Sequence, residues 1–152
     1  MIMTPEEQLD GFIARFTPEI AGLARAALVK MRMRLLSAIQ LVYDNYNALA
    51  VGFGPTQRAS EAIFSLAVYP KRVNLCFLQG GRSSLKDPHG LLQGSGSTNR
   101  FVPLASAAAL DKAEIDDLIA QALIAARIPL PPAGAGGLVI KSVSARQRPR
   151  RP

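Results

Sequence analysis

Apolar residues recur at helical spacing from residue 4 to about residue 36. Two helix-start signals occur in this stretch, at 4–7 and at 17–19, and each places a threonine before a proline and a glutamate. A threonine N-cap and a proline at the first helical position favour a helix start. The pattern therefore predicts two helices, from Pro5 to about Phe16 and from Pro18 to about Leu36.

After Ser37 the apolar positions change to the alternation and short runs that are typical of strands. Asp44-Asn45 and Pro70-Lys71 supply the turn chemistry of two hairpins. Pro103 places the last of these strands at an edge of the sheet. The predicted strands cover 39–43, 47–53, 61–69, 72–78 and 100–104.

The last third of the chain contains one more helix signal. A second capping box at 111–114 predicts an amphipathic helix that ends before Pro129. Residues 130–137 have the composition of a linker. The β-branched residues of 138–144 would add a sixth strand, whereas 146–152 cannot form a core and is expected to be mobile.

These elements predict an α+β protein. Residues 1–129 are expected to form one domain, an antiparallel sheet of five or six strands packed on one face by two N-terminal helices and one C-terminal helix. Residues 130–152 are expected to form a Pro/Gly linker and a basic C-terminal tail.

Composition agrees with one ordered domain. The chain has 152 residues, of which 49% are apolar and 19% charged, and a chain of this kind can bury a single core. No segment approaches the roughly 20 apolar residues that cross a bilayer, so we expect a cytoplasmic protein with no membrane partner. Cys76 is the only cysteine. We interpret it as a small core residue. A catalytic cysteine would need a nearby base, and the sequence indicates none.

The formal charge of +7 originates largely in the tail. Such a tail attracts polyanions by counterion release, which is independent of sequence. A nucleic-acid accessory role, with weak and non-specific contact, is therefore one alternative function. The arginines that would make this contact are Arg146, Arg148, Arg150 and Arg151.

Several motifs resemble the YdhG-like family of uncharacterised bacterial domains, and together they span most of residues 9–127. The matching stretches are Phe12–Glu19, Val42–Leu49, Val51–Pro55, Ala67–Pro70, Asn74–Phe77 and Asp87–Gly96. The resemblance implies a frataxin-like arrangement, in which helices cover an antiparallel sheet. It also implies an iron-chaperone alternative, because some relatives have been proposed for that role.

An iron site would require clustered carboxylates or imidazoles. Glu6, Glu7 and Asp10 are the acids of the first helix and the candidate ligands. Capping and the helix dipole already explain glutamates in a first turn. We therefore expect no cofactor and keep iron as the alternative.

Polar and aromatic residues concentrate in the turns of the predicted sheet. If they converge on one side, they form a polar mouth suited to a small anionic ligand. The glycine-rich segment 90–96 would add backbone N–H groups. The candidate ligand-binding residues are Tyr43, Tyr46, Asn47, Lys71, His89, Gln93, Ser95 and Arg100.

No catalytic set is recognisable. His89 is the only histidine, and the sequence indicates no acid to orient it and no activated serine. We therefore predict a binding or accessory domain for a small ligand or a protein partner rather than an enzyme. A short exposed edge strand would also permit a homodimer by sheet extension.

Overall fold

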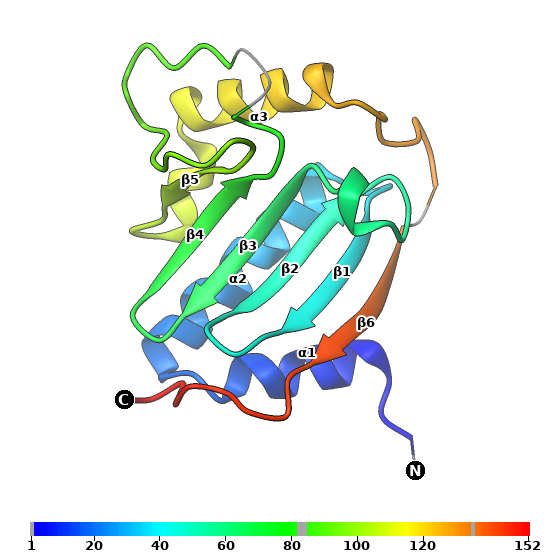
Figure 1. Ribbon diagram of the computed structural model, residues 1–152, viewed down its shortest axis with the longest axis vertical. Coiled ribbons are helices and arrows are strands. Elements are labelled where there is room, and N and C mark those ends of the chain that lie inside the picture. Colours follow the sequence, from blue (N-terminus) through cyan, green and yellow to red (C-terminus); the bar gives the residue numbers. More distant parts are fainter. Residues whose placement is uncertain (1, 82–84, 135) are drawn as a thin grey trace.

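The computed structural model describes residues 2–81, 85–134 and 136–152. The described residues form three α-helices, a sheet of six strands and two short 3-10 helices (Figure 1). The helices are α1 (Pro5–Ala14), α2 (Pro18–Arg34) and α3 (Ala113–Ala125). The strands are β1 (Ile39–Asp44), β2 (Leu49–Gly54), β3 (Phe64–Tyr69), β4 (Arg72–Phe77), β5 (Arg100–Pro103) and β6 (Gly137–Val143). The 3-10 helices are η1 (Ala59–Glu61) and η2 (Ala107–Asp111).

The sheet is mixed, with strand order β5-β4-β3-β2-β1-β6. The first five strands pair antiparallel, as predicted, but β6 runs parallel to β1. The prediction of a purely antiparallel sheet is therefore wrong. The chain returns from α3 at the end of the sheet where β1 begins, and there the Ser37 hydroxyl donates to the Pro131 carbonyl at 2.7 Å (Figure 1). A strand that enters beside the start of β1 must run in the same direction.

Local signals account for the starts of α1 and α2. Thr4 and Glu7 form the predicted capping box, and Thr17 accepts a hydrogen bond from the Ile20 amide. The capping box predicted before α3 does not form, since the helix has no side-chain cap. Asp111 instead accepts a hydrogen bond from Lys30 Nζ at 2.5 Å, so a tertiary contact replaces the local one.

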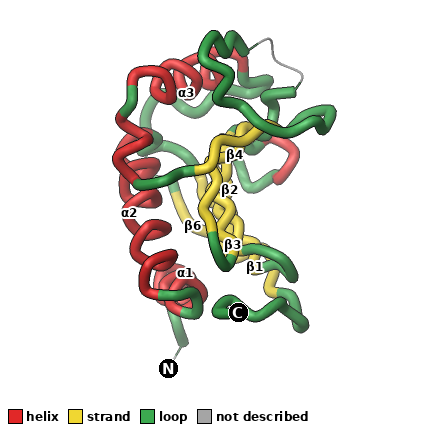
Figure 2. Tube along the Cα trace, turned by 90° about the vertical axis from the view of Figure 1, so that its left-hand side faces the viewer, coloured by secondary structure: helices red, strands yellow, loops and turns green. Residues whose placement is uncertain are grey.

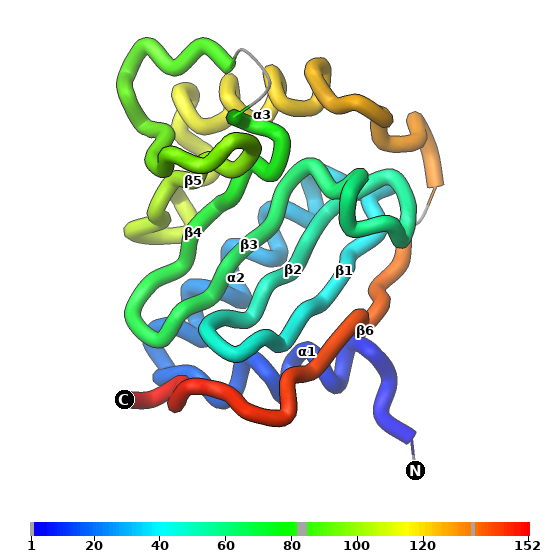
Figure 3. The backbone as a smooth tube through the Cα atoms, in the orientation of Figure 1, coloured from blue at the N-terminus to red at the C-terminus, as the bar shows by residue number. Residues whose placement is uncertain are grey.

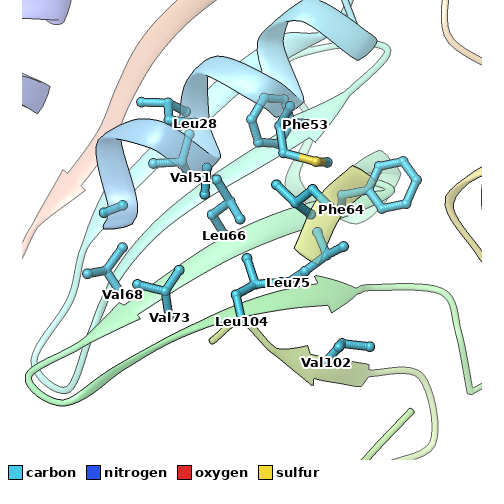
Figure 4. Packing of buried hydrophobic residues seen from close by; sticks show 14 of the residues in the cluster. Leu28, Val51, Phe53, Phe64, Leu66, Val68, Val73, Leu75, Val102 and Leu104 are labelled. Carbon is cyan, nitrogen blue, oxygen red and sulfur yellow. The ribbon is translucent and has the colours of Figure 1, made fainter. Parts of the chain in front are cut away.

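The helices α1 and α2 lie against one face of the sheet, and the opposite face carries no described α-helix (Figure 2). The helix α3 lies near the end of the sheet where β4 ends (Figure 1), and its buried residues Ile115, Leu118 and Ile119 belong to the same core cluster as those of α1 and α2. The core fills the space between α2 and the sheet, where Leu28 lies over Val51, Phe53, Phe64 and Leu66 (Figure 4). The rings of Phe64 and Phe77 meet edge to face at 5.6 Å.

The C-terminal tail packs against the body of the protein. After β6 the chain runs beside α1 and past the β1–β2 hairpin (Figure 3). Arg150 is only 3% exposed and its guanidinium lies 5.4 Å from the ring of Phe16. The expectation that 146–152 is mobile and outside the core is therefore wrong at Arg150.

Candidate functional site

The helix-free face of the sheet has a floor of small side chains. Val51 and Leu66 point into the core, so their neighbours Ala50, Gly52 and Ser65 point to the opposite face. Cross-strand pairing sets Gly52 beside Ser65 and Ala50 beside Ala67. Larger residues border this floor. They are Leu41 and Tyr43 on β1 and Asn74 and Cys76 on β4.

A pocket of about 200 Å³ lies over this floor, and we call it the sheet pocket. Apart from Tyr43 and Ser65, its walls carry no polar side chain among the described lining residues. Its lining residues are Leu41, Tyr43, Ala50, Gly52, Ala59, Ala62, Ser65 and Leu78. The sheet pocket is therefore a site for an apolar group.

A larger pocket of about 540 Å³, the mouth pocket, lies between η1, the end of β4 and the end of α3. Its lining residues are Ala59, Ser60, Ala62, Leu78, Gln79, Thr98, Asn99, Ala125 and Arg127. Ala59, Ala62 and Leu78 line both pockets. The two pockets therefore adjoin, and we call them together the groove.

The segment around η1 forms one wall of the groove, and Gly54 allows it to approach the sheet. A Cβ atom at Gly54 would lie 2.9 Å from the Cα of Ala62, so a larger residue would push this wall outward. The Ile63 amide donates to the Phe53 carbonyl at 2.8 Å. Arg127 Nη2 donates to the Ser60 carbonyl at 2.5 Å, which ties η1 to the end of α3.

The groove is positively charged. Among the residues that the structure describes, Arg127 supplies the one formal charge of the lining, and no aspartate or glutamate lines either pocket. The Arg127 amide donates to Gln79 Oε1 at 3.1 Å, which fixes the backbone that carries the guanidinium. The groove therefore has a polar, cationic end and an apolar end.

Two polar atoms on the helix-free face have no hydrogen-bond partner among the described residues. They are the Tyr43 hydroxyl and Asn74 Oδ1, and Asn74 is only 3% exposed. Buried polar atoms are usually hydrogen-bonded, so unpartnered ones are uncommon in native structures. Both lie on the sheet face that forms the floor of the groove or its border.

Cys76 lies on the helix-free face beside Ser65 and is only partly buried, so the prediction of a core residue is wrong. Burial raises the pKa of the Cys76 thiol, and its hydrogen bond with Ser65 opposes this shift. A raised pKa keeps the sulfur protonated at neutral pH. The structure therefore offers Cys76 as a weak nucleophile at best.

The predicted polar mouth does not form, because its residues lie at opposite ends of the sheet. Tyr46 and Asn47 in the β1–β2 hairpin share one end with Lys71 in the β3–β4 turn (Figure 1). The segment that carries His89, Gln93, Ser95 and Arg100 leads into β5 at the other end. Consecutive turns of an antiparallel meander lie at opposite ends of the strands, so the β1–β2 and β3–β4 turns share one end and the connection from β4 to β5 lies at the other. Of the eight candidates only Tyr43 lines the groove.

Several of the remaining candidates make structural contacts. The Tyr46 carbonyl accepts from the Arg148 amide at 2.9 Å, and its ring lies 5.8 Å from the Arg148 guanidinium. Arg100 donates to the carbonyls of Gly96 and Asn99 in its own loop. Gln93 pairs with Phe101 in an isolated bridge.

His89 lines a separate pocket of about 210 Å³ with Glu114 and Asp117. Gly90 and Gly94 have φ values of 63° and 106°. Only glycine adopts such angles without strain, so these two residues shape the loop as turns.

The candidate iron ligands each accept a hydrogen bond from a protein donor. Glu6 pairs with Arg32 at 2.6 Å and Asp10 with Arg25 at 3.2 Å. Glu7 is engaged in the capping box with Thr4. In the described part of the chain no three metal-ligating side chains cluster. The iron alternative stays a prediction.

Three of the four tail arginines contact the body of the protein. Arg148 lies over Tyr46, Arg150 pairs with Asp44, and Arg151 donates to the carbonyls of Ala14 and Arg15 at the end of α1. Arg146 is exposed. Most of the tail's guanidinium groups thus have intramolecular contacts, and the nucleic-acid alternative stays a prediction.

Sequence reasoning missed the floor and the cation of the groove. A signal for the floor was present, since small residues alternate with large ones at Ala50, Gly52 and Gly54, and again at Ser65 and Ala67. This alternation indicates that one face of the sheet carries small side chains and leaves space above them. Arg127 carried no local signal, because the turn that follows a helix often contains an exposed arginine.

Comparison of the chain with family models, with curated proteins and with solved structures finds no match. None of the described helices combines the length and the hydrophobicity that crossing a bilayer requires.

Proposed function

We propose that this protein is a non-enzymatic binding domain whose ligand lies in the groove on the helix-free face of the sheet. The observation that carries the proposal is the sheet pocket, a hollow of about 200 Å³ over a floor of Ala50, Gly52 and Ser65. Small-molecule sites are typically concave and mostly apolar, with a few convergent polar groups. The groove has this character, with Tyr43 at its apolar end and Arg127 at its polar end.

Two finer statements belong to the same proposal. A frataxin-like, YdhG-like arrangement is supported by the helix pair that covers one face of a largely antiparallel sheet. A cytoplasmic location is supported by the single cysteine, since secreted domains often depend on disulfides.

The substitution Gly52→Val tests the proposal because it fills the sheet pocket without straining the strand. A Cβ atom at Gly52 would meet the Leu41 carbonyl oxygen at 3.6 Å and the Ala62 Cβ at 3.8 Å, both ordinary contacts. Valine also favours strand geometry. The added isopropyl group would occupy the space over the floor.

The measurement is an NMR titration with indole, a small neutral aromatic probe. A gain of about 0.3 kcal/mol for each of the nine non-hydrogen atoms of indole corresponds to a Kd of roughly 10 mM. We expect indole to shift the amide signals of Ala50, Gly52, Ser65 and Leu78 in the wild-type protein. In Gly52→Val these shifts should disappear, whereas the control Gly137→Val on β6, where an added Cβ atom meets no heavy atom within 4 Å, should behave as wild type.

Equal indole binding by Gly52→Val and the wild type would contradict the proposal. So would shifts confined to the exposed apolar side chains of Met33 and Leu36, which lie outside the groove. Circular dichroism would verify that both variants keep the fold.

A further inference from the structure

We infer that the ligand of the groove is a small organic anion, with a carboxylate or a similar acidic group held at Arg127 and an apolar ring system on the Gly52 floor. This inference rests on the function proposed above and adds the chemical class of the ligand. It follows from the separation of charge along the groove.

The first argument is electrostatic. Arg127 is exposed and therefore hydrated, but a cation without an acidic neighbour attracts an anion more strongly than a cation that is already paired. Arg127 lacks such a neighbour in the groove, because the described lining of both pockets includes no aspartate or glutamate. By contrast, Lys30, Arg32 and Arg34 on α2 each pair with an acid at the protein surface.

The second argument is the donor capacity of Arg127. A guanidinium has five N–H donors in a fixed planar arrangement that matches a carboxylate. One donor, on Nη2, reaches the Ser60 carbonyl. This bond and the bond from the Arg127 amide to Gln79 orient the side chain at the rim of the groove. The remaining donors stay available for an acidic group.

The third argument is the distribution of polarity. The polar side chains of Ser60, Thr98 and Asn99 line the mouth pocket together with Arg127. The sheet pocket beyond Ala59, Ala62 and Leu78 is lined almost entirely by apolar groups. A ligand with one acidic end and one apolar end would therefore bind in a single orientation.

The fourth argument is size. The sheet pocket has a volume of about 200 Å³, below the range typical of drug-sized ligands. The apolar part of the ligand is therefore limited to roughly one or two fused rings or a short alkyl chain. Tyr43 lines the sheet pocket, and an aromatic side chain is a favourable neighbour for such a group.

Two probes of nearly the same shape, one anionic and one neutral, measure how much the negative charge of a ligand contributes to its binding. Indole-3-acetate and indole-3-acetamide have nearly the same shape, but only the first is an anion. Both would be titrated into the full-length wild-type protein, into Arg127→Gln and into Arg146→Gln. Arg146 is an exposed arginine outside the groove, so its variant controls for net charge.

We expect the wild type to bind the acetate roughly threefold to tenfold more tightly than the amide, as a charge-assisted hydrogen bond at a partly solvated site would give. Arg127→Gln should remove this preference, so that the variant binds the acetate and the amide with equal affinity. Arg146→Gln should keep the preference. Raising the salt concentration should weaken binding of the acetate only.

The outcomes separate this inference from the proposed function. If the wild type binds both probes equally and Gly52→Val abolishes both, the ligand class is wrong and the groove remains a binding site. If the preference for the acetate persists in Arg127→Gln, the inference is overturned because another cation holds the anion. If neither probe binds the wild type at millimolar concentration, both the proposed function and this inference fail.

Discussion

The ion pair between Asp44 and Arg150 is the most deeply buried of those that the structure describes, with both side chains 2% exposed. Arg150 Nη2 lies 3.0 Å from Asp44 Oδ1 and also donates to the Asn45 carbonyl at 2.6 Å. Asp44 Oδ2 lies 3.7 Å from Arg15 Nη1, an ionic contact longer than a hydrogen bond. Burying a charge is costly unless it is paired, so each of these groups depends on the other.

The substitution Arg150→Ala should therefore lower the free energy of unfolding by about 3–5 kcal/mol, because it leaves the Asp44 carboxylate buried without its main cation. Urea denaturation followed by circular dichroism would measure the change. Arg150→Lys should give an intermediate loss, since lysine keeps the charge and loses the planar donor geometry.

Arg146→Ala is the matched control for this prediction. Arg146 is an exposed arginine of the same tail, and its removal should change the free energy of unfolding by no more than about 0.5 kcal/mol. If Arg150→Ala unfolds at the same urea concentration as Arg146→Ala, the ion pair does not stabilise the fold as argued.

The role of Arg150 could not be predicted from the sequence around it. Its partner Asp44 is 106 positions away, and the flanking residues of the tail are prolines and arginines with no apolar periodicity. Local composition therefore indicated a mobile segment. Only the path of β6 along β1 brings the tail to Asp44.

At the scale of elements, predictions based on local signals agree with the structure more closely than those that require tertiary contacts. The starts of α1 and α2 lie where the Thr-Pro pairs predict them. The start of α3 lacks its predicted cap because Asp111 pairs with Lys30, which is 81 positions away. The direction of β6 likewise depends on where the preceding helix ends.

The capping box of α1 predicts how the stability contributed by Glu7 depends on pH. Hydrogen bonds from Thr4, first from its backbone and then from its side chain, lower the pKa of Glu7 below its ordinary value of 4.5. The folded state thus favours the ionised carboxylate. The stabilisation from Glu7 is present above the pKa of the unfolded chain and is lost as the pH falls through the lower, folded-state pKa.

An NMR titration of the Glu7 side chain would test this prediction. We expect a midpoint below 4.5 in the wild type, and a shift back toward 4.5 in Thr4→Ala, which removes the hydroxyl of the box. Thr17→Ala removes the equivalent cap of α2 and should leave the Glu7 midpoint unchanged. A wild-type midpoint at or above 4.5 would show that the capping box does not form in solution.

At the scale of the whole molecule, the structure has the predicted α+β class, but it does not bring the predicted turn residues together. Strand alternation identifies which residues share a face, so the small residues at Ala50, Gly52 and Ser65 could be placed together. It does not show which turns lie at the same end of the sheet or which face the helices leave open. For that reason the sequence cannot show that His89 and Lys71 lie at opposite ends of the sheet, or that Arg127 lines the groove.

The C-terminal residues 137–152 pack against the rest of the protein, and their first part is a strand of the sheet. The strand β6 pairs with β1 along its length. Beyond it Gln147 Nε2 donates to the Asp44 carbonyl at 3.0 Å, and Arg151 donates to the last carbonyls of α1. Because α1 has no basic residue in its own last turn, Arg151 supplies the cation that favours a helix C-terminus.

A protein shortened to residues 1–136 should therefore be less stable than Arg150→Ala, since it loses the β6 ladder and the cap of α1 as well as the partner of Asp44. If residues 1–129 form a domain that is independent of the tail, the shortened protein should instead unfold at the same urea concentration as the wild type. Urea denaturation of both proteins, followed by circular dichroism, distinguishes these outcomes. Hydrogen exchange would locate the change, because β1 amides that face β6 should exchange faster in the shortened protein while those between β3 and β4 keep their relative protection. Equal stability of the two proteins would show that the tail only rests on the surface of the domain.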